Sequence, residues 1–404
     1  MNGKRESTPR GLRPHIVLAG KRNAGKSALL NALVGENLAI VSPTPGTTTD
    51  PVRRSSELLP FGPVVFVDTA GIDDSEELGR ARVAKSDEAI AGSDLVLYVV
   101  EPLSFDEEDE RALGKLAAEG RWVVPVITHG DRSPERAEAL LPRITAVAGV
   151  PQIVASTTGE GIPALRERII GELGRQKSRQ KSLLEDLIKP YKLILLIVPI
   201  DLEAPAGRLI LPQVQTIREA LDGDAATIVV KEREVSWLLD QLKRPPDLAI
   251  TDSQVVLKAA GAVPPEIPLT TFSILFSRFK GDLDLFVRNA SRIDTLKHGS
   301  RVLITESCSH HAHCDDIGRV KIPRWLRQYT GKELRIDHSG GSFPQDISGY
   351  ELLIHCGGCM ITRSQMLARM SRAETTEAPV TNYGVAISYL HGVLDRVLEP
   401  FGTF

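Results

Sequence analysis

Short apolar runs alternate with helix-length amphipathic segments over the first 174 residues of the chain. We expect strands at the apolar runs, because aliphatic and β-branched residues bounded by turn residues are typical of buried strands. The predicted strands are 15–19, 64–67, 95–100, 123–127 and 153–155, and the predicted helices are 26–34, 78–91, 106–119, 134–148 and 162–173. This alternation predicts an α/β fold with a doubly wound, mostly parallel sheet whose ligand lies at the carboxyl ends of the strands.

The same pattern predicts two smaller α/β regions further along the chain. The first has strands at 193–199, 227–231 and 248–251 with helices at 212–221 and 234–242. A proline cluster at 263–268 marks the next boundary, because consecutive prolines lack backbone donors and resist helix. Beyond it we expect strands at 301–306 and 351–354. The predicted parts are a flexible terminus (1–13), a nucleotide-binding domain (14–174), a linker (175–183), a middle α/β domain for structure or dimerisation (184–262) and a metal-binding domain (263–404).

Composition limits the classes of partner. The chain has 404 residues and a formal net charge of −3, which gives no overall attraction to nucleic acid or to an anionic membrane. Its longest apolar run, 193–200, is far shorter than the ~20 residues that span a bilayer. The basic amino terminus lacks the apolar core of a secretory signal. We therefore expect a cytoplasmic protein in a reducing compartment, with neither a nucleic acid nor a membrane as its partner.

A phosphate-binding loop stands at residues 20–27, which read Gly-Lys-Arg-Asn-Ala-Gly-Lys-Ser. The loop follows a predicted strand and opens a predicted helix, as this motif requires. Its glycines allow backbone N–H groups to face phosphates, Lys26 can reach the outer phosphates, and the Ser27 hydroxyl can ligate magnesium. The residues expected at the nucleotide are Gly20, Asn23, Ala24, Gly25, Lys26 and Ser27.

A second phosphate motif, Asp-Thr-Ala-Gly at 68–71, ends a strand. The Asp68 carboxylate is suited to hold magnesium through water, and the Gly71 amide can sense the γ-phosphate. Between the two motifs, 45–50 is a polar loop of the kind that orders around a γ-phosphate and magnesium. Two phosphate motifs in this order predict a nucleoside triphosphate hydrolase.

These motifs resemble the translation-factor-like GTPases, in particular the branch that includes the tRNA-modification and ribosome-assembly GTPases. The resemblance implies that Asn23 lies by a potassium ion near the phosphates and that Thr48 ligates magnesium. Ile72 stands where Ras-like proteins have a glutamine, which implies slow hydrolysis stimulated by potassium. The residues expected to carry hydrolysis are Lys26, Ser27, Thr48 and Asp68.

Base recognition is predicted to rest on Asp131. The segment 128–131 reads Thr-His-Gly-Asp where GTPases of this type have Asn-Lys-x-Asp. A carboxylate can accept from both N1–H and the exocyclic amine of guanine, so Asp131 favours GTP over ATP. Loss of the asparagine and lysine predicts weakened binding. Ser156 opens a Ser-Thr-Thr segment in place of the usual Ser-Ala-Lys loop and is expected near the base.

Metal chemistry is predicted in the last third of the chain, where all four cysteines and four of the nine histidines occupy two short segments. Each segment follows a predicted strand, so both lie on loops, where binding groups are usually presented. The thiolates of Cys308, Cys356 and Cys359 suit an iron–sulfur cluster or zinc. Glycines at 357 and 358 permit the tight path that lets two sulfurs converge. Buried, unreactive thiols are the alternative.

The pattern C-x-H … H-C-x-x-C, joined to a GTPase and a middle α/β domain, resembles the FeFe-hydrogenase maturation GTPase family known as HydF over essentially the whole chain. The resemblance implies a homodimeric scaffold that receives a diiron subcluster as cargo, works with radical-SAM hydrogenase maturases and serves apo FeFe-hydrogenase. It also implies a 4Fe-4S cluster with one exchangeable iron position. The implied cluster ligands are Cys308, Cys356 and Cys359, with His310, His355 or Glu306 as the candidate fourth ligand.

Two alternatives stay open. Cys314 is either an inert neighbour or a fourth thiolate that closes the site. The whole chain could instead be an RNA- or ribosome-associated GTPase with a zinc-binding carboxyl-terminal domain, although that domain lacks a basic, aromatic-rich stretch.

Overall fold

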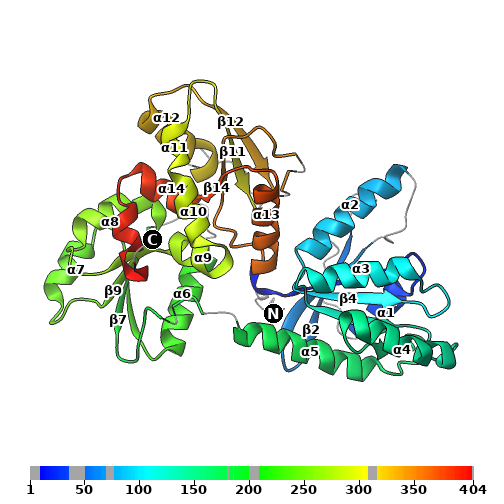
Figure 1. The fold of residues 1–404 in the computed structure, drawn as a ribbon. Helices are drawn as coiled ribbons and strands as arrows, with labels where there is room; N and C mark the ends of the chain where they lie inside the picture. Colours follow the sequence, from blue (N-terminus) through cyan, green and yellow to red (C-terminus); the bar gives the residue numbers. More distant parts are fainter. Residues whose placement is uncertain are drawn as a thin grey trace, which may run out of the picture. The chain divides into compact units, whose positions relative to one another are not determined.

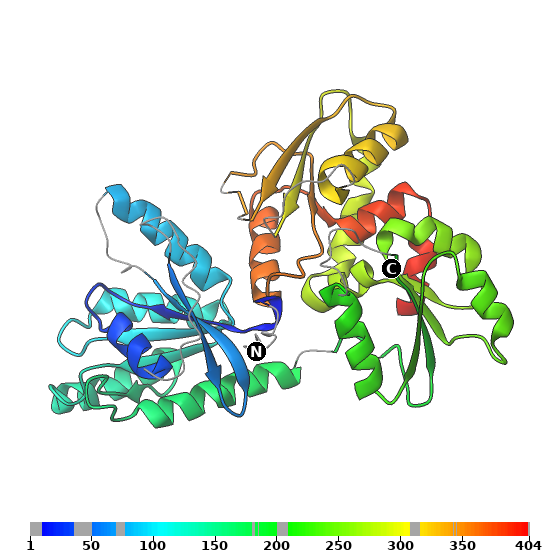
Figure 2. The ribbon, with the colours of Figure 1, turned by 180° about the vertical axis from the view of Figure 1, so that it is seen from behind.

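A computed structural model gives the fold (Figures 1 and 2). It describes residues 10–35, 51–69, 77–179, 182–184, 186–199, 209–307, 316–341, 343–344 and 346–402, with side chains undescribed at 77–82. The chain forms two compact units, Met1–Gln180 and Lys181–Phe404. Each unit is described by itself.

The first unit contains a six-stranded sheet in the order β2-β3-β1-β4-β5-β6. All pairs in it are parallel except β2 with β3. Its strands are β1 (His15–Ala19), β2 (Val52–Leu58), β3 (Gly62–Asp68), β4 (Leu95–Val100), β5 (Val123–Ile127) and β6 (Gln152–Ile153). Its helices are η1 (Arg10–Leu12), α1 (Lys26–Val34), α2 (Glu77–Ala91), α3 (Glu107–Ala118), α4 (Pro134–Ala148) and α5 (Ile162–Arg179). The predicted doubly wound, mostly parallel sheet is confirmed.

Alternating side chains of β1 explain why helices cover both faces of this sheet. Ile16 and Leu18 are fully buried in a core with α1 and α5. Val17 and Ala19 are equally buried on the opposite face, where α2, α3 and α4 pack. A strand buried on both faces reads as a continuous apolar run, which is why the sequence pattern located it.

The second unit holds two four-stranded parallel sheets, in the orders β10-β9-β7-β8 and β12-β11-β13-β14. The strands are β7 (Leu193–Ile197), β8 (Ala226–Val230), β9 (Leu248–Thr251), β10 (Leu269–Thr271), β11 (Arg301–Glu306), β12 (Arg335–Gly340), β13 (Leu352–His355) and β14 (Val380–Asn382). The expectation of further α/β domains is therefore confirmed.

Helices cover these two sheets. They are α6 (Leu211–Asp222), α7 (Val235–Gln241), η2 (Ser253–Val255), α8 (Val256–Ala262), α9 (Phe272–Lys280), α10 (Leu283–Ala290), α11 (Arg292–Thr295), η3 (Ile317–Lys321), α12 (Ile322–Thr330), α13 (Arg363–Thr375), α14 (Tyr383–Leu390), α15 (Leu394–Leu398) and η4 (Glu399–Phe401). Among the described helices, none is long and apolar enough to cross a bilayer.

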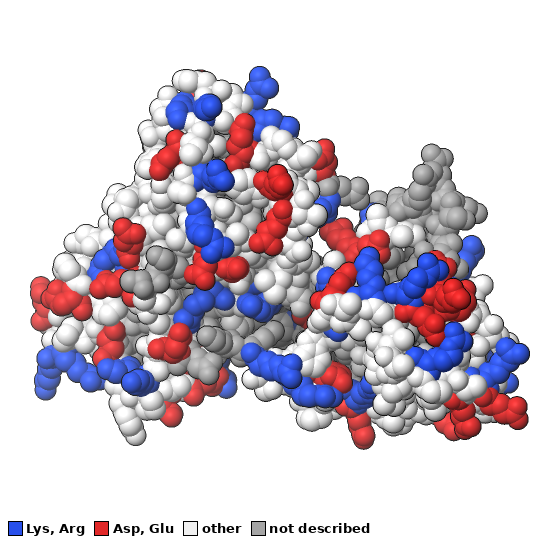
Figure 3. Space-filling view, viewed as in Figure 1, with Lys and Arg blue, Asp and Glu red and all other residues white. Residues whose placement is uncertain are grey.

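One apolar core joins the two sheets of the second unit. It extends from Leu195 in β7 and Ala249 in β9 to Ile304 in β11 and Ile354 in β13. Strand pairing also continues past the proline cluster at 263–268, because β10 pairs with β9. The surface of this unit and of the first carries both signs of charge, interspersed over the face shown in Figure 3.

Candidate functional site

The phosphate loop has a backbone conformation that favours glycine at two positions. Gly20 has φ +137°, and a Cβ there would lie 2.2 Å from the carbonyl oxygen of Val99 in β4. Gly25 has φ +88°, immediately before α1. Asn23 between them has φ 62°, a left-handed conformation that asparagine tolerates better than most residues, and its side chain is exposed. The loop can therefore approach a ligand closely with its backbone.

The Lys26 ammonium lies inside this loop. Lys26 is buried, and its Nζ donates to the carbonyl oxygens of Gly20 at 2.9 Å and Lys21 at 2.6 Å. The charge thus sits among the loop residues at the amino-terminal end of α1, where the helix dipole also favours an anion. This arrangement suits the phosphates of a nucleotide.

Ser27 and Asp68 meet at the carboxyl end of β3. The exposed Ser27 hydroxyl donates to Asp68 Oδ2 at 2.6 Å. Asp68 Oδ1 is buried and has no hydrogen-bond partner within the described part of the chain. Burial raises the pKa of Asp68, although Ser27, Lys26 and Arg54 counteract the rise. A hydroxyl beside a carboxylate with a spare oxygen provides the hard oxygen donors that Mg²⁺ prefers, so these residues fit that metal.

Thr128 has a role that sequence analysis missed. Its Oγ1 lies 2.8 Å from the carbonyl oxygen of Ala24 in the phosphate loop and 3.1 Å from that of Val100 in β4. The hydroxyl has one proton to donate, and the shorter contact is to the loop. Thr128 is therefore a tether between the end of β5 and the phosphate loop, besides being the residue that replaces the expected asparagine.

Lys21 is a second tether that the sequence pattern did not reveal. Its Nζ lies 2.6 Å from the Asp106 carboxylate and 3.0 Å from that of Asp109, at the amino-terminal end of α3. Asp109 is buried and also accepts a hydrogen bond from Tyr98 in β4. Burial opposes the charge of Lys21, yet these two carboxylates raise its pKa. The phosphate loop is thereby fixed to α3 and β4.

The predicted base-binding residues lie together. Thr157 Oγ1 donates weakly to Asp131 Oδ2 at 3.4 Å, and the amide of Gly130 donates to the carbonyl of Val154 at 3.2 Å. Asp131 is exposed, whereas the Ser156 hydroxyl is buried without a hydrogen-bond partner among the described residues. The two segments that sequence analysis assigned to the base are thus neighbours at the ends of β5 and β6.

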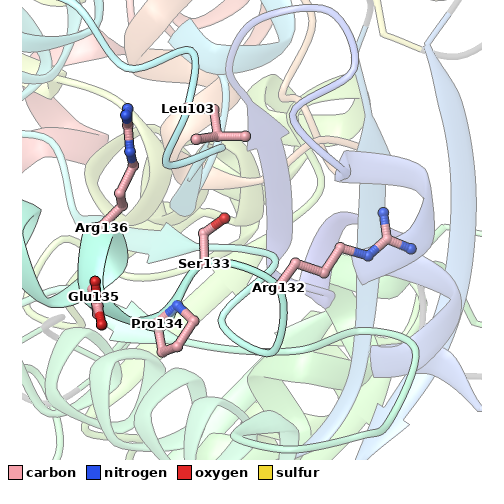
Figure 4. Close-up of a pocket in the computed structure, with 6 residues that line it drawn as sticks. All are labelled: Leu103, Arg132, Ser133, Pro134, Glu135 and Arg136. Carbon is pink, nitrogen blue, oxygen red and sulfur yellow. The ribbon is translucent and has the colours of Figure 1, made fainter.

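A small hollow lies next to Asp131, at the start of α4 (Figure 4). Its volume is about 280 Å³, and none of the phosphate-loop residues lines it. Figure 4 shows the side chain of Leu103, from the segment after β4, opposite those of the α4 start. The lining residues are Leu103, Arg132, Ser133, Pro134, Glu135 and Arg136.

Parallel register brings the two cysteine segments together at their strand ends. Thr305 in β11 is paired with His355 in β13, and the amide of Cys356 donates to the carbonyl of Thr305 at 2.9 Å. Two residues after Thr305, the amide of Ser307 donates to Cys356 Sγ at 3.2 Å. Ser307 is the residue that precedes Cys308 in the chain. The described ends of both segments therefore meet at Cys356.

Several predicted residues lie outside the described part of the structure. They are Thr48, Gly71, Ile72, Cys308, His310 and Cys314. Among the described residues, no group of three histidine, cysteine or carboxylate side chains is arranged to hold a metal ion. The two cysteines that are described, Cys356 and Cys359, are both free thiols.

The environment of Cys356 favours a thiolate. Burial alone would raise its pKa. A positively charged His355, the Ser307 hydroxyl and the amide of Gly358 together lower the pKa to about 6, and a neutral His355 contributes less to this lowering. Burial and the nearby Cys356 raise the pKa of Cys359, while Lys280 opposes this rise. Thiolates are the species that bind iron or zinc, so this loop fits a soft metal or an iron–sulfur cluster.

His355 uses both of its ring nitrogens within the protein. Nδ1 lies 2.6 Å from the carbonyl oxygen of Cys356, and Nε2 lies 2.9 Å from Nη1 of Arg369. Arginine can only donate, so Nε2 accepts and Nδ1 carries the proton. Arg369 also donates to the Ser307 hydroxyl at 2.9 Å. His355 is a predicted candidate for the fourth ligand, and to bind iron through Nε2 it has to leave Arg369.

Glu306, another candidate ligand, is buried beside Tyr383 and Arg319. The Tyr383 hydroxyl donates to Glu306 Oε1 at 3.4 Å, and Arg319 Nε lies 3.9 Å from Oε2. Burial and the nearby charges of Cys356 and Glu306 raise the pKa of Tyr383. Glu306 thus already has protein partners close to the cysteine loop.

Three family models match successive parts of the chain. Residues 15–129 match the 50S ribosome-binding GTPase model. Residues 183–281 match the hydrogen maturase F dimerization domain, and residues 284–400 match its tetramerization domain. The chain belongs to the hydrogen maturase F family, HydF. The predicted family is confirmed, and the first unit of this HydF protein is a GTPase domain.

Relatives of the GTPase domain resemble only part of this HydF chain. The tRNA modification GTPase MnmE of Cupriavidus metallidurans is 33% identical over 42% of this chain and 39% of its own length. MnmE of Salinibacter ruber is 39% identical over 33% of this chain and 29% of its own. The chain spans about two fifths or less of the length of these curated relatives. The G domain of the T. maritima FeoB iron transporter is 25% identical, with a TM-score of 0.31 over 40% of this chain and 99% of that one.

Proposed function

We propose that the protein is a GTP-hydrolysing scaffold that carries a 4Fe-4S cluster and delivers the diiron subcluster to apo FeFe-hydrogenase. The observation that carries this proposal is the meeting of the two cysteine segments at Cys356, where the ends of β11 and β13 lie in register. Membership of the hydrogen maturase F family agrees with it. The diiron subcluster is cargo, and the 4Fe-4S cluster is the resident group.

In the GTPase domain, catalysis is positioning and charge stabilisation. Lys26 neutralises the outer phosphates from within the loop, and Ser27 and Thr48 ligate Mg²⁺, with Asp68 holding it through water. Asn23 contacts K⁺, and Asp131 reads guanine with Ser156 beside it. The Gly71 amide senses the γ-phosphate. With Ile72 in place of a glutamine, hydrolysis is slow and is stimulated by K⁺.

In the second unit, Cys308, Cys356 and Cys359 hold the cluster. His310, His355 or Glu306 occupies the fourth position, and Cys314 is an inert neighbour. When bound, the cluster supplies an exchangeable iron position that can take a bridging ligand from the cargo. The low pKa of Cys356 keeps its sulfur available as a thiolate, and Arg369 orients His355 beside it.

The proposed setting is the cytoplasm, with a homodimer that exchanges cargo with radical-SAM hydrogenase maturases and the apo-hydrogenase. The family model that covers residues 183–281 supports self-association, since it describes a dimerization domain. The proposed partners do not include nucleic acid or membrane, which agrees with the net charge of −3.

Maturation of apo-hydrogenase in vitro tests this function. Protein loaded with the diiron subcluster under anaerobic conditions should activate apo-hydrogenase, whereas Cys356→Ser should not. Because Cys356 lies in the second unit, the variant should hydrolyse GTP at the wild-type rate. Full activation by Cys356→Ser would refute the proposed scaffold role.

A second candidate function is favoured by the 33–39% identity of the GTPase domain to tRNA modification GTPases. In it, the chain acts on RNA or the ribosome, and the cysteines hold zinc. Iron and zinc assays after anaerobic purification distinguish the two functions. A brown iron protein supports the scaffold, and a colourless zinc protein supports the RNA-associated GTPase.

A further inference from the structure

Lys280 places a buried positive charge behind the cysteine loop. It is the last residue of α9, and only 1% of it is exposed. Its Nζ donates to the carbonyl oxygens of Gly358 at 3.1 Å, Cys359 at 3.3 Å and Ile361 at 2.7 Å. Its ammonium therefore contacts the backbone of the loop that carries Cys356 and Cys359 at several points.

The helix that presents Lys280 is packed too tightly to shift freely. A Cβ on Gly384 in α14 would lie 2.3 Å from that of Ser273 in α9, so the two helices are in close contact. At the end of α9, Arg363 in α13 donates to the carbonyl of Phe279 at 2.5 Å. The Phe276 ring lies 5.7 Å from the Lys280 ammonium. These contacts fix the position of the charge.

A charge in this place has a clear chemical use. Burying an ammonium is unfavourable unless nearby groups compensate for it. The three carbonyl oxygens that accept from Lys280 carry only partial charges. An oxidised 4Fe-4S core held by three thiolates carries a net negative charge, because its core charge is smaller than the charge of the three sulfurs. In a medium of low dielectric constant a nearby cation stabilises that negative charge strongly. The stabilisation is greater for the reduced cluster, which is one unit more negative.

We propose that Lys280 is a positioning residue of the cluster site, which anchors the Cys356–Cys359 loop through its carbonyls and offsets the negative charge of the cluster. This inference rests on the proposed 4Fe-4S function. It also means that the site is shared between domains. Lys280 lies in the segment matched by the dimerization model, and the loop lies in the segment matched by the tetramerization model.

Three variants of the full-length chain test the inference. Lys280→Met removes the charge and the donors but keeps a long apolar stem, and Lys280→Arg keeps the charge. Lys258→Met is the matched control, because Lys258 is an exposed lysine on α8 in the same unit. Each protein is reconstituted anaerobically with ferrous iron and sulfide. The midpoint potential is measured by a redox titration followed by EPR, and the rate of iron loss to a chelator is measured in parallel.

Lys280→Met should show a more negative potential and iron loss about tenfold faster than wild type, as expected for a supporting group of a metal site. Lys280→Arg should restore most of the potential, and Lys258→Met should match wild type. If Lys280→Met fails to fold, Lys280→Gln, which keeps a donor without charge, is compared with Lys280→Arg. Equal potentials and equal iron-loss rates in the charged and uncharged variants at position 280 would overturn this inference but leave the proposed function standing. A wild-type chain that takes up no cluster would overturn both the proposed function and the inference.

Discussion

At the scale of single residues, Thr128 shows how one hydroxyl can support the phosphate loop from a neighbouring strand end. It replaces the asparagine expected for guanine recognition, yet its Oγ1 lies 2.8 Å from the carbonyl of Ala24 in the phosphate loop. A valine of the same shape would leave that carbonyl without this donor.

We predict that Thr128→Val weakens GTP binding about tenfold. Loss of a buried hydrogen bond costs about 1–2 kcal/mol, and here it also loosens the loop that binds the phosphates. Thr128→Ser keeps the hydroxyl and is the control, so its affinity should stay near that of wild type. Titration with a fluorescent GTP analogue measures both. Equal affinity for Thr128→Val and Thr128→Ser would show that the tether has no role in binding.

The two glycines between the cysteines provide a matched pair. Gly358 has φ +63°, and a Cβ there would lie 2.4 Å from the terminal carbon of Met366. Gly357 has open space around the position of its Cβ and no positive φ. Gly358→Ala should therefore lower the iron bound per chain after reconstitution, whereas Gly357→Ala should not. Iron assays on both variants decide the matter, and equal iron contents would contradict this account of the loop.

Which residues could be found from sequence depends on the range of their contacts. Lys26, Ser27 and Asp68 stand in local sequence motifs, so the sequence alone predicts them as site residues. The structure brings Ser27 and Asp68 into contact. Thr128 and Lys280 act on groups 104 and 78 residues away in the chain. Neither belongs to a local motif, and such pairing is created only by the fold.

At the scale of elements, buried strands were predicted well. The bounds of β1, β4, β5, β9 and β11 agree with prediction, because strands with both faces buried read as apolar runs. The edge strand β2 and the partly exposed β12 were missed, since their sequences are rich in arginine, serine and aspartate. The three-residue strands β10 and β14 are too short to leave a periodic signal. Helix α5 continues to Arg179, so residues 175–179 of the predicted linker (175–183) are helix.

His15, the first residue of β1, should make the stability of the first unit depend on pH. Burial, and to a lesser extent Arg53, lowers the pKa of His15 to about 4 from its ordinary value of 6.5. Between pH 4 and pH 6.5, His15 therefore binds a proton in the unfolded chain but not in the folded chain. Stability is complete above pH 6.5 and falls as the pH decreases towards 4.

We expect this histidine to cost the first unit about 2 kcal/mol between pH 7 and pH 5. Urea unfolding of wild type and His15→Gln at both pH values measures the effect. Between pH 7 and pH 5, the free energy of unfolding should fall about 2 kcal/mol less in His15→Gln than in wild type, because glutamine does not titrate. The same loss of stability in both proteins would contradict the assignment of a neutral, buried His15.

At the scale of the whole molecule, the chain divides into a GTPase unit and a second unit whose two sheets share one core. Proline composition placed a domain boundary at residue 263, but β10 pairs with β9 beyond it. A proline cluster shows where a helix cannot continue, but it does not show which strands pair beyond that point. The cysteine loop and the helix that supports it consequently pack on one shared core.

Calorimetry should show two unfolding transitions. A nonhydrolysable GTP analogue with Mg²⁺ should raise the midpoint temperature of one transition. At a ligand concentration a hundred times the dissociation constant, binding adds about 2.7 kcal/mol to the free energy of unfolding. Cluster reconstitution should raise only the other. A single transition, or one in which both midpoints rise with nucleotide, would contradict this division of the chain.

The central claim is that three cysteines from two distant segments hold a 4Fe-4S cluster. Anaerobic reconstitution followed by iron and sulfide assays and EPR of the reduced protein tests it most directly. The account predicts about four irons and four sulfides per wild-type chain. It predicts loss of the cluster signal in Cys308→Ser, Cys356→Ser and Cys359→Ser, with Cys314→Ser unchanged. A full cluster signal in the three single variants, or zinc in place of iron in the wild type, would contradict it.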